Sequence, residues 1–503
     1  MVRPSGPNLA YRRLIGRIGR IGRSLVFFAV RSVGYLAAVM DGAMEFADSD
    51  IMRCVRRIAE LIRDGGGRAL LVGGCVRDAL LGEGCKDFDL EVYGLSAQGL
   101  QDILASHFRL ELVGASFGVF KVCGWPIDLA LPRRENKTGR GHRGFVVEAT
   151  PDLDIAEAAA RRDLTINAIL CDPLSGELID PWHGVDDLRA GLLRHVSEHF
   201  AEDPLRVLRV MQFTARLGFA VAPETVALCR SMTPEDLPAE RLAGEWEKLL
   251  LQGRQPSLGL RFLRDCGWLG YYPELAALVG CEQDARWHPE GDVWEHTLLA
   301  LDAAVGRRNG TRDDDLAVAL AVLCHDFGKA VTTVHDDDGH IRSSGHEVVG
   351  EELAGAFLRR MWSEVSLLDI VLRLVREHMC PMGLIINDAS DKAIRRLSLR
   401  VGGRMDLLLR VVECDMVASA GRGQEADLGP LRAFAARVAA LSVMTEAPKP
   451  LVLGRHALAL GEKPGRALGE LLQACFEKQL DGEFSDLAGG LQCLEALLAQ
   501  RRG

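Results

Sequence analysis

Residues 70–94 combine a short apolar run, two adjacent glycines and a segment in which acidic and apolar residues alternate. The apolar run at 70–72 is typical of a buried strand, and the pair Gly73 and Gly74 follows it directly. Glycine lets the backbone approach a bound phosphate closely, and a helix that starts there favours anions at its N-terminus. The alternating segment 86–92 has the period of a half-buried strand. This order of elements predicts an α/β domain with a phosphate-binding turn beside an acidic strand.

The acidic residues of the second strand fall on one face. Asp87, Asp89 and Glu91 are two residues apart, and side chains alternate along a strand, so all three point the same way. Carboxylates in this arrangement can hold a pair of Mg²⁺ ions. Asp128 is a candidate third carboxylate, because it alternates with apolar neighbours at 126–131 as an adjacent strand would place it. Acids on an ordinary solvated strand give the same pattern, so the neighbouring motifs are needed to distinguish a metal site from a solvated strand.

Longer motifs supply that context. Gly-Gly-Cys-Val-Arg-Asp at 73–78 and the acidic strand at 86–92 are followed by Arg-Arg-Asp-Leu-Thr-Ile-Asn-Ala-Ile at 161–169 and Glu-Asp-Pro-Leu-Arg-Val-Leu-Arg at 202–209. Together these motifs resemble the tRNA nucleotidyltransferase and poly(A) polymerase family, and in particular bacterial CCA-adding tRNA nucleotidyltransferases. The resemblance implies template-independent addition of C, C and A to tRNA 3′ ends from CTP and ATP, with Mg²⁺ at the reaction site.

The resemblance also implies roles for individual residues. The catalytic carboxylates are Asp87, Asp89 and Asp128, of which Asp87 and Asp89 bind magnesium. The nucleotide-binding residues are Gly73, Gly74, Arg77, Arg162, Asp203, Arg206 and Arg209. The last three are spaced by three, so on a helix they present an acceptor beside forked donors, and in the family this face reads cytosine and adenine. A second interpretation of Asp203 stays open, because an aspartate before a proline is also a common helix cap.

A second constellation begins at residue 288. His296 falls in an expected amphipathic helix, His325 and Asp326 follow an apolar helical run, and Asp415 lies in a third such run. This set resembles an HD phosphohydrolase domain, which implies metal-dependent phosphatase or 2′,3′-cyclic phosphodiesterase activity in tRNA repair. Imidazole ligands suit Ni, Co or Mn better than Mg²⁺.

Three further residues near this set have two interpretations each. His346 and His378 could complete a two-metal site, or could be ordinary core or surface histidines. Lys329 could meet a substrate phosphate, or could be a solvated lysine past a helix end.

Composition agrees with a multi-domain enzyme. The chain has 503 residues, 26% of them charged, and a formal net charge of −10, so contact with RNA must come from local basic patches. We predict one patch in a flexible loop at 133–143 and a weaker one formed by arginines at 395, 396, 400 and 404. The thirteen cysteines contain no Cys-x-x-Cys pair, which favours a reduced cytoplasm.

The predicted fold is an α/β nucleotidyltransferase head with a mixed sheet, followed by an all-α remainder. The expected regions are an N-terminal extension at 1–46, the head at 47–200, a helical base-recognition and neck region at 201–285, the HD domain at 286–446 and a helical tail at 447–503. The apolar part of the extension is short and is interrupted by Arg31, so it predicts no stable membrane span. A targeting helix is one interpretation, and an upstream start-codon assignment is the one we favour.

We expect a cytoplasmic enzyme whose partners are tRNA, CTP and ATP, with a homodimer as a further expectation. A poly(A) polymerase of the same superfamily is the nearest alternative, although the familiar bacterial poly(A) enzymes lack an HD domain. A chain that is chiefly an HD nucleotide phosphohydrolase with a nucleotide-binding head is the alternative from another class. The presence of both Asp87 and Asp89 argues against it.

Overall fold

The computed structural model describes residues 44, 46, 48–113, 118–137, 145–337, 339–421 and 423–502. Almost all of the predicted N-terminal extension therefore lies outside the described residues. The chain divides into two compact units, a sheet unit of Met1–Glu245 with Leu258–Trp268, and a helical unit of Trp246–Ser257 with Leu269–Gly503. This division passes through the predicted neck at 201–285, so the sequence-based domain boundaries stay predictions.

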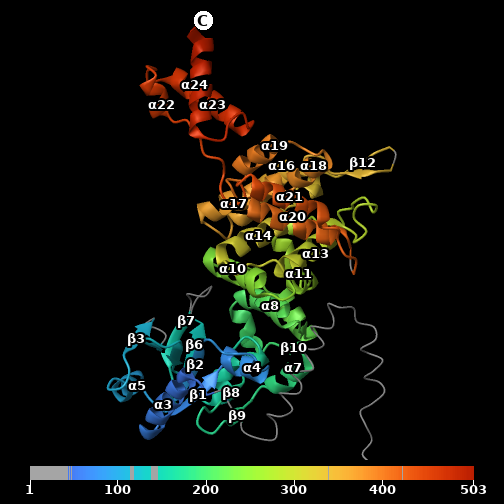
Figure 1. Cartoon of the computed structure of the whole chain (residues 1–503). Coiled ribbons are helices and arrows are strands. Elements are labelled where there is room, and N and C mark those ends of the chain that lie inside the picture. The colour runs from blue at the N-terminus through green and yellow to red at the C-terminus, as the bar shows by residue number, and fades with distance from the viewer. Residues whose placement is uncertain are drawn as a thin grey trace, which may run out of the picture. The chain divides into compact units, whose positions relative to one another are not determined.

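A seven-stranded mixed sheet forms the centre of the sheet unit, which confirms the predicted fold class (Figure 1). Its strands, in spatial order, are β3 (Leu110–Val113), β4 (Val119–Val122), β5 (Ile127–Ala130), β2 (Phe88–Tyr93), β1 (Arg68–Val72), β8 (Leu170–Cys171) and β9 (Leu178–Ile179). Strands β2 and β5 run parallel, and the other neighbouring pairs run antiparallel. The acidic strand is thus an interior strand of the sheet.

Helices and short strands complete the sheet unit. They are α3 (Asp50–Asp64), α4 (Gly74–Leu80), α5 (Ala97–Leu104), α6 (Ile155–Ala160), η1 (Thr165–Asn167), α7 (Gly184–Ala190), β10 (Leu192–Leu193), η2 (Glu198–Glu202), α8 (Leu205–Leu217), β11 (Ala220–Val221) and α9 (Pro223–Arg230). Helix α3 shows how the sequence specifies these elements. Its N-cap Ser49 accepts the Met52 amide at 3.1 Å, and a stripe of residues from Met52 to Ile62 is buried on one face.

The predicted loop at 133–143 is partly wrong. Strand β6 (Arg133–Lys137) pairs with β7 (Phe145–Ala149) in an antiparallel ladder, so the first five residues of the predicted loop form a strand. The β-formers of β7 supply a partner strand, and that pairing outweighs the polar composition of β6. Residues 138–144 lie outside the described part of the chain.

Helix α14 (Arg312–Cys324) lies at the centre of the helical unit, where it packs against α13 (Val293–Val305), α17 (Val365–Glu377) and α20 (Met405–Ser419) (Figure 1). Every residue from Asp315 to Cys324 is buried, which explains why this segment reads as a continuous apolar run. The all-α prediction is confirmed apart from a small hairpin of β12 (Val334–His335) and β13 (Ile341–Arg342).

The remaining helices of the described residues fall between Ala239 and Arg502. They are α10 (Ala239–Glu247), η3 (Lys248–Gln252), α11 (Pro256–Asp265), η4 (Trp268–Tyr271), α12 (Pro273–Ala276), α15 (Lys329–Thr332), α16 (His346–Leu358), α18 (Cys380–Ile386), α19 (Asp391–Arg400), α21 (Gly429–Ala440), α22 (Gly454–Ala459), α23 (Arg466–Leu480) and α24 (Leu487–Arg502). The last three share a small core that includes Val452, Leu471 and Leu494. Among the described helices, none is long and apolar enough to cross a membrane.

The first testable prediction concerns Gly184 at the start of α7. A Cβ atom there would lie 2.1 Å from the carbonyl oxygen of Thr165, which is backbone and cannot move aside easily. We expect Gly184→Ala to lower the free energy of unfolding of the sheet unit by about 1–3 kcal/mol, because overpacking forces the backbone to shift. Thermal denaturation followed by circular dichroism measures the change.

Gly244→Ala is the matched control, because Gly244 lies in α10 and a Cβ atom there meets nothing within 4 Å. Alanine is the better helix former, so this variant should be as stable as the parent or slightly more stable. Equal melting temperatures for the Gly184 and Gly244 variants would contradict the prediction.

Candidate functional site

The predicted catalytic carboxylates lie side by side on neighbouring strands. The parallel ladder of β2 and β5 places Asp89 directly opposite Asp128, and Asp87 stands one residue before β2. The residues packed around Asp89 desolvate its carboxylate and raise its pKa, although part of the residue is exposed. Arg162 lowers this pKa, and repulsion from Asp128 and Asp87 raises it further. A divalent cation would offset the repulsion that Asp128 and Asp87 exert on Asp89, so the arrangement fits magnesium ligands.

The glycine turn lies between these acids and an arginine. Gly73 has a φ of +74°, a conformation that side chains disfavour. A Cβ atom at Gly73 would lie 3.3 Å from Nη1 of Arg162 and 4.0 Å from Oδ2 of Asp89. Arg162 also donates to Oε2 of Glu91 at 3.4 Å. The glycine turn, Arg162 and the acidic residues thus lie close together, and we call this group the acidic site. Glu91, which the pattern placed with the acids, is buried as a partner of Arg162.

Arg77 points into the protein. Its guanidinium is buried, donates to Oδ1 of Asn167 at 2.6 Å and to Oδ1 of Asp78 at 2.8 Å, and lies 4.9 Å from the ring centre of Phe213. These contacts favour a role in holding α4 in place over direct contact with a phosphate. The nucleotide-binding role of Arg77 stays a prediction.

A buried network connects this region to α8. Asp163 accepts hydrogen bonds from Nε of Arg209 at 2.7 Å and from Nδ2 of Asn167 at 2.9 Å. Burial alone would raise the pKa of Asp163, but Arg209 and Asn167 outweigh it and lower the pKa to about 2. Asn167 joins Arg77 to Asp163 through opposite ends of its amide. The sequence reasoning missed Asn167, although it lies within the Arg-Arg-Asp-Leu-Thr-Ile-Asn motif.

Base reading by Asp203 stays a prediction, because both oxygens of this carboxylate have partners within the protein. Its Oδ1 accepts the amide of Leu205 at 3.1 Å, so it does cap the start of α8. Its Oδ2 accepts from Nη2 of Arg241 at 2.7 Å. Arg206 donates to the carbonyl oxygens of His199 and Arg161, each at 2.6 Å. Arg241 was missed because it lies 38 residues further along the chain, on α10.

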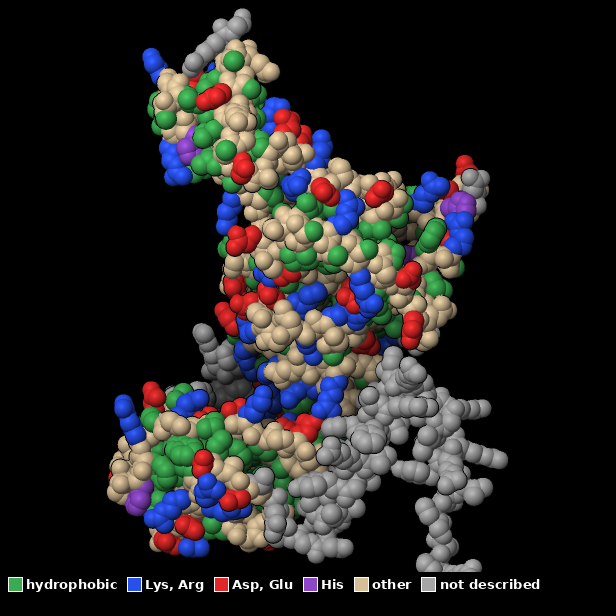
Figure 2. Space-filling view, viewed as in Figure 1, with side chains coloured by type: hydrophobic (Ala, Val, Ile, Leu, Met, Phe, Trp, Pro, Cys, Tyr) green, Lys and Arg blue, Asp and Glu red, His purple; other side chains and the backbone are tan. Residues whose placement is uncertain are grey.

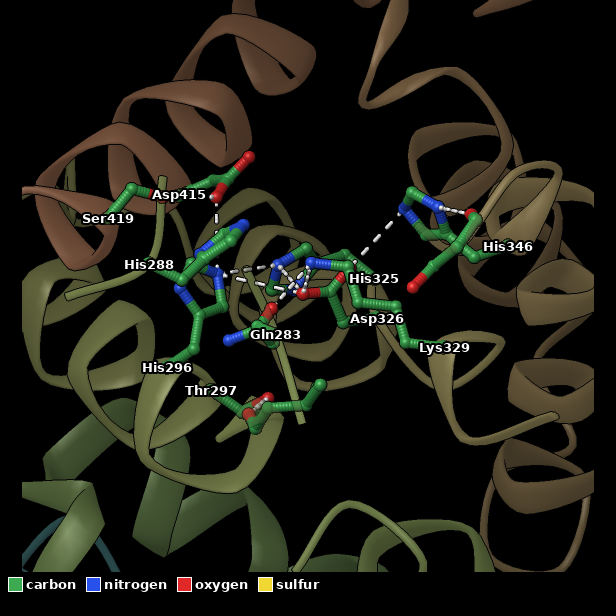
Figure 3. Close-up of polar contacts among 12 residues, drawn as sticks. Gln283, His288, His296, Thr297, His325, Asp326, Lys329, His346, Asp415 and Ser419 are labelled. Atoms are coloured by element: carbon green, nitrogen blue, oxygen red, sulfur yellow. Dashed lines mark hydrogen bonds and ion pairs between the residues drawn. The ribbon is translucent and has the colours of Figure 1, made fainter. Parts of the chain in front are cut away.

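The second candidate site is a cluster of four histidines and two aspartates inside the helical unit (Figure 3). Its residues are His296 on α13, His325 and Asp326 after α14, His346 at the start of α16, His378 after α17 and Asp415 on α20. The structure therefore brings together all six residues that the sequence proposed for the HD site, including the two whose role was left open.

The cluster has two halves. Nε2 of His296 lies 3.2 Å from Nε2 of His325 and 3.1 Å from Oδ1 of Asp415. In the other half, Nε2 of His346 lies 3.2 Å from Nε2 of His378. Asp326 lies between them, with Oδ2 3.3 Å from His325 and Oδ1 3.4 Å from His346. One carboxylate thus faces both halves, as a bridging ligand would.

The ring orientations favour metal ligation through Nε2. Nδ1 of His325, His346 and His378 lies 2.7–2.8 Å from backbone carbonyl oxygens, so these rings carry their proton on Nδ1. In the pair of His346 and His378, unprotonated Nε2 atoms then face each other at 3.2 Å, which is unfavourable without a cation between them. Ligands on one ion with bonds of about 2.1 Å lie roughly 3.0–3.4 Å apart, so the observed spacings fit a divalent metal in each half.

The charges at the cluster are strongly coupled. Burial by itself lowers the pKa of His296, but Asp415 and Glu290 outweigh it and raise the pKa to about 9. Burial, with repulsion from His325, lowers the pKa of His378 to about 3. Burial opposes ionisation of Asp326, yet His325 and Lys329 hold its pKa well below its usual range. One half of the cluster thus attracts cations while the other keeps a neutral imidazole.

Lys329 and Glu290 extend the cluster. Nζ of Lys329 lies 2.8 Å from Oδ2 of Asp326 and donates to Oε1 of Gln283 at 2.8 Å, so this lysine is buried beside the carboxylate and is not solvated. Glu290 accepts from Nδ1 of His296 at 2.7 Å. The sequence reasoning missed Glu290, because a glutamate outside the histidine and aspartate pattern carries no motif of its own.

The predicted arginine patch at 395–404 is largely neutralised. Arg396 pairs with Glu477 and Asp481, while Arg400 pairs with Glu377. Arg404 pairs with Asp314 and Asp406. On the face shown in Figure 2, basic and acidic side chains are intermingled over this unit. These arginines therefore serve internal contacts between helices, which the local sequence could not reveal because most of the acidic partners lie far along the chain.

Three parts of the chain match known families. Residues 69–194 match the family described as Poly A polymerase head domain, residues 218–278 match a probable RNA and SrmB-binding site of polymerase A, and residues 293–412 match the HD domain. The first match contains the glycine turn and the three carboxylates that the sequence predicts to be catalytic. The third contains five of the six cluster residues, and Asp415 lies three residues beyond it.

Two relatives are named Multifunctional CCA protein. The one from Azoarcus sp. (strain BH72) is 41% identical over 367 residues, which cover 71% of this chain and 85% of that protein. The one from Laribacter hongkongensis (strain HLHK9) is 40% identical over 379 residues, which cover 74% of this chain and 89% of that protein.

Solved structures share the fold. The CCA-adding enzyme of Bacillus stearothermophilus in complex with CTP matches with a TM-score of 0.62 and 23% identity, over 90% of this chain and all 100% of that chain. The Thermotoga maritima CCA-adding enzyme complexed with tRNA matches with a TM-score of 0.57 and 19% identity, over 93% of this chain and 98% of that one. These similarities establish the fold.

The Asp163 network gives a prediction about stability. Asp163→Asn removes one partner of a buried ion pair, so we expect it to destabilise the sheet unit by about 3–5 kcal/mol at pH 7. The pKa of Asp163 is lowered to about 2, so its ionisation stabilises the fold above about pH 4, and this contribution is lost as the pH falls towards 2. Between these pH values the parent should lose about 2 kcal/mol more than the variant.

Thermal denaturation at intervals from pH 7 to pH 2.5 tests this pH dependence. Asp102→Asn is the control, because Asp102 is exposed on α5 and lies outside the network. Parallel stability curves for the parent and the Asp163 variant would show that Asp163 is not the titrating group.

Proposed function

Because the chain belongs to the multifunctional CCA protein family, we propose that it adds C, C and A to the 3′ ends of tRNA from CTP and ATP. The observation that carries this proposal is the register of the sheet, which sets Asp89 opposite Asp128 next to the glycine turn at Gly73. Family membership and the positions of the carboxylates in the acidic site both favour nucleotidyl transfer over a binding function.

In this proposal the acidic site binds the triphosphate. Asp87, Asp89 and Asp128 would hold Mg²⁺, which supplies activation of the tRNA 3′-hydroxyl and neutralises the leaving pyrophosphate. Gly73 leaves room for phosphate oxygens, and Arg162 at the edge of the turn supplies donors to them. Glu91 keeps the Arg162 guanidinium in place, since it is buried and bound to it at 3.4 Å.

Base selection is assigned in the proposal to the start of α8. Asp203 and Arg206 lie there with acceptor and donor groups suited to the edges of cytosine and adenine. Arg241 holds one oxygen of Asp203 at 2.7 Å, so the carboxylate presents a defined orientation. Arg209, anchored by Asp163 at 2.7 Å, supplies a further donor on the same helix.

We also propose that the histidine cluster is a phosphohydrolase centre. His296, His325 and Asp415 would hold one divalent metal, His346 and His378 a second, and Asp326 would face both. The metals would supply an activated water and polarise the phosphoester. Nitrogen ligands favour Ni, Co or Mn over Mg²⁺, and Lys329 provides a positive charge for a substrate phosphate. Phosphate monoesters and 2′,3′-cyclic phosphates at RNA ends are the proposed substrates.

Two alternatives fit less well. A poly(A) polymerase needs no buried cluster of histidines, and the relatives at 40% and 41% identity are named CCA proteins. A chain that works only as an HD phosphohydrolase needs no pair of carboxylates on adjacent strands. Cytoplasmic location and homodimer formation stay predictions.

Asp89→Asn tests the first activity. It keeps the shape of the side chain but removes a magnesium ligand, and the loss of several kcal/mol of metal stabilisation corresponds to a rate reduction on the order of 10³-fold or more. The measurement is incorporation of labelled CTP and ATP into tRNA that lacks its terminus. Binding of tRNA and phosphoesterase activity should be unchanged.

The control is Asp102→Asn, which removes an exposed carboxylate elsewhere in the same unit. It should incorporate both nucleotides at the parental rate. Incorporation at the parental rate by the Asp89 variant would overturn the assignment of nucleotidyl transfer to the acidic site.

His325→Ala tests the second activity. We expect it to abolish hydrolysis of a 2′,3′-cyclic nucleotide in Ni²⁺, Co²⁺ or Mn²⁺, because one metal loses an imidazole ligand and Asp326 loses its neighbour. CCA addition to truncated tRNA should continue at the parental rate. His335→Ala, which changes an exposed histidine of the same unit, should retain both activities. Absence of phosphoesterase activity in the parent with every metal would refute this part of the proposal.

A further inference from the structure

A buried glutamate lies behind the metal-facing histidine of α13. Oε1 of Glu290 is 2.7 Å from Nδ1 of His296 and 2.9 Å from Nδ1 of His288. The side chain of Glu290 has no exposed surface. Its second oxygen, Oε2, is buried and has no hydrogen-bond partner among the described residues. A carboxylate buried with one oxygen unpaired is costly, so the contacts of its other oxygen must compensate for it.

His296 is the exception among the four histidines of the cluster. Nδ1 of His325, His346 and His378 meets a neutral backbone carbonyl in each case. Among these four, only Nδ1 of His296 hydrogen-bonds a carboxylate, at 2.7 Å from Glu290. The carboxylate of Glu347 lies 3.7 Å from Nδ1 of His346, beyond hydrogen-bond distance. A carboxylate behind a ligand imidazole increases the basicity of the other ring nitrogen and holds the ring in one orientation. The two halves of the cluster are therefore chemically different.

The spacing identifies this contact as a hydrogen bond rather than shared metal coordination. Two ligand atoms on one ion with bonds of about 2.1 Å lie roughly 3.0–3.4 Å apart. The Glu290 to His296 distance of 2.7 Å is shorter, and it is ordinary for a charge-assisted N–H to oxygen bond. The Nε2 to Nε2 distance of 3.2 Å on the other side of the His296 ring falls within the range for coordination.

We propose that Glu290 is a positioning residue that fixes the Nδ1 proton of His296 and makes the half formed by His296, His325 and Asp415 the tighter of two metal sites. This inference rests on the proposed metal centre. It predicts that the cluster loads its metals in sequence, with the half on α13 and α20 first and the half at His346 and His378 second. His288, which shares the same oxygen of Glu290, is the outermost member of the chain of hydrogen bonds.

Titration of the metal-free full chain with Co²⁺ tests the proposal directly. Visible absorption reports cobalt bound to nitrogen ligands, a competing chelator gives the affinities, and excess Mg²⁺ occupies the oxygen-only site of the head. We expect two binding steps in the parent. Glu290→Gln should weaken the tighter step about 10–100-fold, change its absorption spectrum and leave the weaker step unchanged. CCA addition should stay at the parental rate.

Glu282→Gln is the matched control, because Glu282 is an exposed glutamate 3.4 Å from His335, a histidine outside the cluster. It should bind cobalt as the parent does. Glu290→Asp, which keeps the negative charge, should recover part of the lost affinity, and it replaces the glutamine variant if that variant fails to fold. Parental cobalt affinity in either folded Glu290 variant, or equal weakening of both steps, would overturn the inference.

The metal titration needs no substrate, so its outcome is independent of the phosphoesterase assay. Altered cobalt binding in a chain without phosphoesterase activity would leave the role of Glu290 in place and overturn the proposed reaction. A parent that binds no cobalt at the cluster would overturn both.

Discussion

The parallel pairing of β2 with β5 determines the chemistry of the sheet unit. It puts Asp89 and Asp128 on directly opposite residues, and repulsion from Asp128 adds to the burial that raises the pKa of Asp89. A divalent cation relieves that repulsion, so the strand register itself prepares a metal site. Gly73 and Arg162 lie next to Asp89, on the side where phosphates would bind.

A buried polar network connects the helices next to the acidic site. Arg77, Asn167, Asp163 and Arg209 form an unbroken series of hydrogen bonds from α4 to α8. Each partner is satisfied by the next, so removal of one member leaves a buried charge or amide unpaired. The helix after the glycine turn and the helix proposed to read bases are therefore held by the same set of side chains. Fidelity and catalysis would share one structural support.

In the helical unit, hydrogen bonds with the surrounding residues orient the histidine rings of the cluster. Four imidazoles and two carboxylates come together from five helices or the residues that directly follow them, and all are buried except the partly exposed Asp415. Backbone carbonyls orient three of the rings, while Glu290 orients the fourth. The apolar helix α14 makes this possible, because it places His325 and Asp326 at the end of a fully buried segment. The asymmetry between carbonyl and carboxylate partners distinguishes two halves of an otherwise repetitive cluster.

The sequence alone determined the mixed α/β head and the helical remainder, and it predicted a ligand set for each site, because strand alternation, glycine turns and spaced histidines are local patterns. It could not determine contacts between distant segments. Asn167 as a link between Arg77 and Asp163, Arg241 on Asp203, Glu290 behind His296 and the ion pairs of Arg396 and Arg400 were all decided by tertiary packing. A buried polar group takes whichever partner the fold brings near, and sequence separation carries no record of that choice.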